Sequence, residues 1–244
     1  MRALTSLYLP LVLASLLAGC VATPPNNVST QEAYRAAISD AAVASPGKVA
    51  PLRVLPAGAT ITMVSWVTEQ RLPCTNDALP CDMKVGATPL WVTLGGEVQS
   101  ICRTWNLHGD ALRRRLEQLL GLPMDPPVQY RKTKFVDLEI PRERIERPCL
   151  GVDETDPTKP VCTIDARSST SAELRTFIGE QMAASYVVDN PKGPGYPYTR
   201  LGYTYDWAPT ANAKHYGASE FIVAPATTAK ATKVVAADDY CRAP

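Results

Sequence analysis

The sequence predicts an α+β domain with a mainly antiparallel sheet, two principal helices and several disulfides. Segments with strand-like alternation slightly outnumber helical segments and are not regularly interleaved with them, which argues against a doubly wound α/β fold. The 22 prolines, against 14 glycines, indicate many loops and argue against a long helical bundle. Six of the seven cysteines can pair once the one nearest the N-terminus is set aside.

Three segments have the helical spacing of apolar residues. Residues 31–44 form a short alanine-rich helix that Pro46 ends. Residues 110–120 begin at Asp110, a good N-cap, and stop at Gly121. Residues 171–186 form the second principal helix. The predicted buried stripes are Leu112, Leu116, Leu119 and Leu120 in the first principal helix and Leu174, Phe177, Ile178 and Met182 in the second.

Extended segments account for most of the remaining chain. Residues 59–67 carry apolar side chains on both faces, which predicts a central strand, and residues 133–140 alternate cleanly with Val136, Leu138 and Ile140 inward. Residues 90–94 form another short strand. Residues 218–224 and 231–237 flank a small polar turn and are predicted to pair as a hairpin.

The first 19 residues predict an export signal. Arg2 is followed by an apolar run at residues 7–17, which is too short to span a bilayer, where about 20 residues are needed. The run closes as LAGC at residues 17–20, and this motif resembles the lipobox of bacterial lipoproteins. The resemblance implies cleavage before Cys20 and acylation of Cys20, and Val21 in place of aspartate implies the outer membrane. An ordinary secretory leader is the alternative.

Cleavage before Cys20 divides the chain into a signal peptide (residues 1–19), a lipidated N-terminus and tether (20–30) and a single α+β domain (31–244). Arg2 is the only charge in the leader, so 25 basic residues become 24, which equals the 24 acidic ones. A chain with no net charge lacks the field that gathers nucleic acid, so no nucleic-acid partner is expected. The domain would face the periplasm or the cell surface.

The cysteines other than Cys20 predict three disulfides. Six cysteines can pair in 15 ways, of which short loops favour two pairs and elimination leaves a third. These pairs are Cys74–Cys81, Cys149–Cys162 and Cys102–Cys241. Zinc binding is disfavoured because six residues separate Cys74 from Cys81 and no second cysteine or histidine pair lies nearby. We therefore expect no metal and no cofactor.

Signals for catalysis are weak. The two histidines, His108 and His215, belong to no nucleophile, zinc or phosphate-loop motif. Asp206 and Glu220 lie in the aromatic-rich C-terminal third and could serve as acid or base in a hydrolase that uses paired carboxylates, but no spacing singles them out.

Residues 195–207, GYPYTRLGYTYDW, hold four of the ten tyrosines. The candidate binding surface is Tyr198, Arg200, Tyr203, Tyr205 and Trp207. Flat amphipathic rings on one strand face stack on sugars or anchor a protein partner. The alternative is that the rings fill a half-buried sheet, where aromatics are common anyway.

The WVTL strand leading to Cys102, the LLGLP helix end, the TKFVDLEI strand and the YPYTRLGYTYDW segment resemble uncharacterised exported proteins of proteobacteria. The resemblance spans about residues 90–241 and implies one exported domain, with no particular active site. The sequence therefore predicts an outer-membrane-anchored lipoprotein with a binding or envelope-organising role. Its partners would be the membrane, through the lipid anchor, and an envelope protein or a glycan. Two alternatives stay open: a cell-envelope glycan hydrolase, and an inhibitor or immunity lipoprotein that blocks a toxin enzyme.

Overall fold

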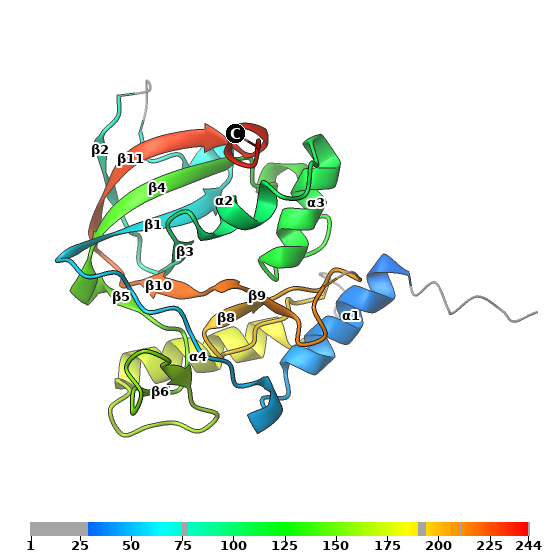
Figure 1. The fold of residues 1–244 in the computed structure, drawn as a ribbon, viewed down its shortest axis with the longest axis vertical. Helices are drawn as coiled ribbons and strands as arrows, with labels where there is room; N and C mark the ends of the chain where they lie inside the picture. The colour runs from blue at the N-terminus through cyan, green and yellow to red at the C-terminus, as the bar shows by residue number, and fades with distance from the viewer. Residues whose placement is uncertain (1–28, 75–77, 190–193, 210, 244) are drawn as a thin grey trace, which may run out of the picture.

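A seven-stranded antiparallel sheet lies at the centre of the computed structural model, which describes residues 29–74, 78–189, 194–209 and 211–243 (Figure 1). Its strand order is β2-β11-β4-β1-β3-β10-β5. The strands are β1 (Thr60–Val67), β2 (Cys81–Lys84), β3 (Leu90–Leu94), β4 (Lys134–Pro141), β5 (Ile145–Glu146), β10 (Phe221–Val223) and β11 (Thr228–Ala236). Every pairing is antiparallel, which confirms the predicted α+β class.

The middle of the sheet is buried on both faces. β1 pairs with β4 over its whole length, from Thr60 opposite Pro141 to Val67 opposite Lys134. One face carries an apolar cluster that includes Met63 and Leu138, and the other carries Val64, Trp66 and Phe135. The prediction of a central strand at residues 59–67 is therefore confirmed.

Within the described residues there are five α-helices: α1 (Thr30–Ala41), α2 (Glu97–Cys102), α3 (Gly109–Leu119), α4 (Ala172–Ser185) and α5 (Ala237–Tyr240). Helices α2, α3 and α5 gather beside the face that carries Trp66 and Phe135 (Figure 1). The leucine stripe of α3 packs there as predicted. The stripe predicted for α4 is only partly correct, because Ile178 is fully buried whereas Leu174, Phe177 and Met182 are half-buried.

A second, smaller layer lies below the large sheet (Figure 1). It contains α1, α4 and the pair β8 (Tyr203–Tyr205) and β9 (Tyr216–Ser219). A further short pair, β6 (Val152–Asp153) and β7 (Val161–Cys162), lies near α4. Tyr34 and Ile38 of α1 pack on Tyr205 and Trp207, so the N-terminal helix is fixed to the C-terminal third of the chain.

The predicted hairpin at residues 218–224 and 231–237 is wrong. β10 pairs with β3 and β5, whereas β11 pairs with β4 and β2, so the two strands lie in different halves of the sheet. The physical reason is that each strand pairs with apolar residues of a strand that is distant in the sequence. Phe221 pairs with Val92 of β3, and Ala231 pairs with Leu138 of β4.

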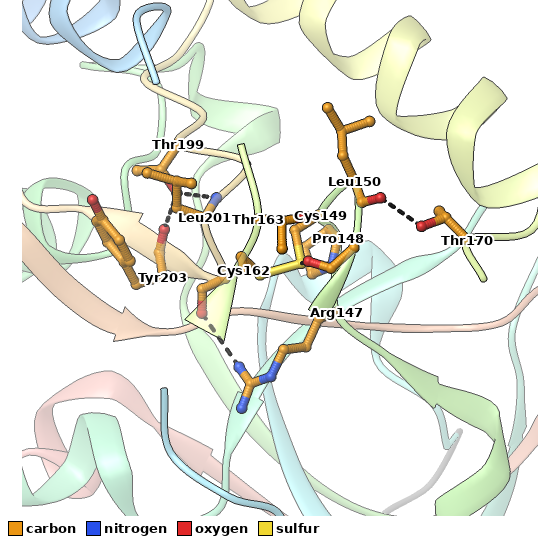
Figure 2. The surroundings of a disulfide bond; sticks show 12 residues. Arg147, Pro148, Cys149, Leu150, Cys162, Thr163, Thr170, Thr199, Leu201 and Tyr203 are labelled. Carbon is orange, nitrogen blue, oxygen red and sulfur yellow. Dashed lines mark hydrogen bonds between the residues drawn. A yellow bond between two sulfur atoms is a disulfide. The ribbon is translucent and has the colours of Figure 1, made fainter. Parts of the chain in front are cut away.

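The three predicted disulfides are confirmed. The Cα atoms of Cys74–Cys81, Cys102–Cys241 and Cys149–Cys162 are 6.2, 5.2 and 6.0 Å apart, within the usual range for a disulfide. Cys102–Cys241 joins α2 to the segment after α5. Figure 2 shows Cys149–Cys162 with its surroundings, between the segment at Arg147 and Pro148 and the segment at residues 199–203.

The leader and the predicted acylation site, Cys20, lie outside the described residues, so the lipobox stays a prediction. Within the described part of the chain, no helix is long and apolar enough to cross a membrane.

Candidate ligand-binding cavity

The aromatic segment does not form an exposed surface. The exposed fractions are 2% for Tyr198, 6% for Tyr203, 6% for Tyr205 and 2% for Trp207, and Arg200 is half-buried. Trp207 packs edge-on against Tyr34, with ring centroids 5.0 Å apart. The hydroxyl of Tyr203 donates to the carbonyl of Lys48 at 2.8 Å, and that of Tyr205 donates to Asp40 at 3.0 Å. The predicted exposed surface is therefore wrong, because helix α1 and the residues that follow it cover the rings of Tyr203, Tyr205 and Trp207. Tyr198 is buried elsewhere, on the wall of a cavity.

The large sheet opens between β1 and β3. These strands pair only at Met63 with Leu94 and at Val64 with Thr93, whereas β1 stays paired with β4 as far as Val67. Beyond Val64, the hydroxyl of Ser65 bridges to the carbonyl of Trp91 at 3.1 Å. The end of β1 thus has a strand neighbour on one side only.

A cavity of about 1060 Å³ lies at this opening. One part of its wall comes from sheet residues, including Val67, Leu90, Val92, Val136 and Leu138. Another part of the wall is more aromatic. It includes Trp66 of β1, Trp91 of β3, Leu120 and Leu122 at the end of α3, and Tyr196 and Tyr198. Sites for small molecules have volumes of roughly 300–1000 Å³ and mostly apolar and aromatic walls. The cavity has the size and lining of such a site.

The tyrosine wall is held rigidly. The Tyr198 hydroxyl donates to the carbonyl of Pro148 at 2.6 Å. Pro148 directly precedes Cys149 of the Cys149–Cys162 disulfide (Figure 2). The Tyr198 ring meets Trp91 edge-on, with centroids 5.7 Å apart. Gly121, which has a φ of +60°, brings the end of α3 close to this wall. A Cβ atom there would lie 3.3 Å from the carbonyl oxygen of Pro197.

Glu220 is the most unusual group on the cavity wall. It lies between β9 and β10, where its backbone N–H donates to the carbonyl of Gly202 at 3.0 Å. Its Oε2 atom is buried and has no hydrogen-bond partner among the described residues. Burial raises the pKa of this carboxyl to about 8, so it is neutral at pH 7.

Two other lining residues also hold a buried polar atom that finds no partner within the described ranges. These atoms are Nε1 of Trp66 and Oε2 of Glu117. Buried polar atoms are almost always hydrogen-bonded in native proteins, so each exception needs an explanation. Three residues with such atoms around one cavity indicate that a ligand there would need to offer polar groups as well as apolar surface.

Lys132 gives the cavity a basic group. It is half-buried, and burial, together with the neighbouring charge of Arg71, lowers its pKa to about 8. Arg71 and Tyr130 also line the cavity and are exposed, Tyr130 by 64%. The cavity therefore reaches the surface on the side of these residues.

The carboxylate pair considered from the sequence is not brought together for catalysis. Asp206 accepts two hydrogen bonds from Arg115, at 3.0 and 2.6 Å, and is 3% exposed. It does not line the cavity, whereas Glu220 does. Neither histidine lines it either: His108 is exposed near Asp238, and His215 stacks on Tyr205. Asp206 thus has a structural role.

In the described ranges, no group of three or more histidine, cysteine, aspartate or glutamate side chains could hold a metal ion. No family model, curated protein or solved structure matches the chain. Sequence reasoning missed the cavity because it arises where β1 and β3 separate. One signal was available: Glu220 directly precedes the apolar run at residues 221–224.

Proposed function

We propose that this protein is a cell-envelope lipoprotein that binds a small, largely apolar ligand in the cavity between β1 and β3. The observation that carries the proposal is the cavity itself, with its volume of about 1060 Å³ and its aromatic walls. It supports the binding role predicted from the sequence but moves the site. The candidate contact is the cavity rather than the buried rings of Tyr203, Tyr205 and Trp207.

Two features support a place in the cell envelope. Three disulfides are typical of proteins that fold in an oxidising compartment. The LAGC motif at residues 17–20 supplies an acylation site at Cys20, and multiple acyl chains give stable anchoring, here in the outer membrane. A tether of ten residues reaches at most about 35 Å, so the cavity would stay close to the membrane surface. This placement favours a ligand that partitions into membranes.

A cavity-filling substitution tests the proposal. Leu120 lies on the cavity wall at the end of α3, and Leu120→Trp would occupy part of the space. Leu107→Trp is the matched control, since Leu107 is also half-buried but packs outside the cavity. Residues 21–244 would be exported behind a cleavable secretory leader and titrated with the uncharged fluorescent probe N-phenyl-1-naphthylamine.

We expect saturable binding of one probe per chain in the wild type and in Leu107→Trp, and at least a tenfold loss of affinity in Leu120→Trp. Circular dichroism would check that both variants are folded. Absence of saturable binding in the wild type would overturn the proposal, as would equal affinities in the two folded variants.

A further inference from the structure

We infer that the ligand carries a positively charged nitrogen beside an apolar body, and that Glu220 and the rings of Trp91, Tyr196 and Tyr198 hold this charge. The inference rests on the proposed function, because it specifies the chemistry of a ligand in the same cavity. All four side chains line that cavity.

Glu220 lacks a counterion within the part of the chain that the structure describes. No ion pair involves it, and its Oε2 atom has no hydrogen-bond partner there. A buried carboxylate without a partner is costly, so natural proteins pair such groups or keep them protonated. A cation in the cavity would provide the missing partner.

The tyrosines around Glu220 present rings to the cavity, because their hydroxyls are engaged elsewhere. Tyr198 donates to the carbonyl of Pro148, and Tyr196 donates to Oε1 of Gln181. Behind them, Tyr186 donates to the carbonyl of Tyr198 at 2.9 Å. None of these three hydroxyls donates to the carboxyl. The rings contribute π faces instead, which attract ammonium groups and attract them more strongly when water is excluded.

The second tryptophan of the wall extends this aromatic group. Trp91 lies 5.7 Å from Tyr198 and 5.7 Å from Phe177 of α4, measured between ring centroids. Proteins bind quaternary and protonated amines in pockets that are lined by aromatic rings and a carboxylate, and this cavity has both in Trp91, Tyr198 and Glu220. The apolar sheet residues Val92 and Leu138 continue the wall and would contact the uncharged part of the ligand.

Other charged groups face the cavity from the surrounding elements. A pH dependence of ligand affinity caused by Glu220 must therefore be distinguished from one caused by these groups. They are Arg71 after β1, Asp82 and Lys84 of β2, Glu117 of α3 and Lys132 before β4. Arg200 does not line the cavity; it contacts the sulfur of Met182 at 3.6 Å and lies close to Tyr186. Of these, Lys132 has a pKa of about 8 and would lose its charge in the same pH range as Glu220 gains one. The Glu220→Gln variant separates the two.

Binding of a permanent cation should release the proton of Glu220. With a pKa of about 8, about 1% of the carboxyl is ionised at pH 6 and about half at pH 8 in the empty protein. Affinity for the cation should therefore rise by up to about 50-fold between these pH values. An uncharged ligand of the same shape should show no such rise.

The test uses the full-length acylated chain in nanodiscs, with empty nanodiscs as the blank. The probes are 4-phenylbutyltrimethylammonium and its uncharged isostere, in which carbon replaces nitrogen. We expect the wild type to bind the cation at least tenfold more tightly than the isostere at pH 8. Glu220→Gln should remove this preference and the pH dependence while it still binds the isostere, which shows that the cavity is intact. Glu146→Gln, an exposed change on β5, should behave as the wild type.

Equal binding of the two probes to the wild type would overturn the inference and leave the proposed function standing. A cation preference that persists in Glu220→Gln would also overturn it, and a pH dependence that persists in this variant would be assigned to Lys132. Failure of both probes to bind would count against the inference and the proposed function together.

Discussion

Replacing Glu220 with glutamine should remove a large, pH-dependent cost to stability. In the folded protein this carboxyl keeps its proton up to about pH 8, whereas in the unfolded chain it loses the proton near its ordinary pKa of 4.5. Folding therefore takes up a proton between these values, and the free energy of unfolding falls as the pH rises through them. The cost of burying the group corresponds to about 3 kcal/mol at pH 7 and about 5 kcal/mol at pH 9. Glutamine has the same shape and no charge to bury.

The assay is urea unfolding at pH 5, 7 and 9, followed by tryptophan fluorescence with the disulfides intact. Glu220→Gln should match the wild type within about 1 kcal/mol at pH 5, where the wild-type carboxyl is protonated in the folded state. Relative to its difference from the wild type at pH 5, the variant should gain about 4 kcal/mol at pH 9. The exposed Glu146→Gln should stay within about 0.5 kcal/mol of the wild type throughout. A difference between Glu220→Gln and the wild type that is the same at all three pH values would refute the reasoning.

Three further predictions concern the disulfides, the buried ion pair and the anchor. Cys102→Ser with Cys241→Ser should lower the free energy of unfolding by roughly 5 kcal/mol, because the disulfide closes a loop of 139 residues. Calorimetry would measure this loss of stability, and a loss below about 1 kcal/mol would contradict the loop argument. Asp206→Ala should lower the free energy of unfolding by about 3–5 kcal/mol, because it leaves Arg115 unpaired, whereas Arg115→Met with Asp206→Leu should lower it by less. Urea titrations that show the reverse order would count against this prediction. Cys20→Ala should take up no labelled palmitate and should retain its leader, and a labelled or processed variant would rule out Cys20 as the acylated residue.

Features that depend on local pattern could be predicted from the sequence. The alternation at Val136, Leu138 and Ile140 correctly assigned three side chains of β4 to one buried face. The cysteine pairs were also predictable, since two short loops fixed two pairs and left Cys102 and Cys241 for each other. In both cases the pattern that decides the structure lies within a short span of chain. The third cysteine pair follows by elimination once the two short loops are assigned.

Features that depend on long-range arrangement could not be predicted. β10 and β11 are neighbours in sequence but pair with different strands, because apolar partners on β3 and β4 outweigh the short turn between them. Tyr205 and Trp207 had the composition of a recognition surface, yet α1, more than 160 residues earlier in the chain, covers them. Aromatic residues suit both a buried sheet and an exposed contact, so composition alone does not separate the two.

The candidate site, too, could be predicted only in part from the sequence. Glu220 could be named from the sequence as a C-terminal carboxylate, but the burial of its Oε2 atom and its place on the same cavity wall as Trp91 and Tyr198 follow from the packing of three separate segments. The cavity exists because β3 leaves β1 after Val64 and pairs with β10 instead. Nothing in the strand pattern of residues 90–94 indicates where that separation occurs.

The most direct test of the central claim is a map of where a ligand binds. A 4-phenylbutyltrimethylammonium analogue with a diazirine on its ring would be photolysed with the full-length acylated protein at pH 8, and the labelled peptides would be identified by mass spectrometry. We expect labels within residues 64–67, 82–93, 117–123 and 196–198, and competition with unlabelled probe should remove them. Labels confined to the outer surface of α1 or α4, or labels that competition does not reduce, would contradict it.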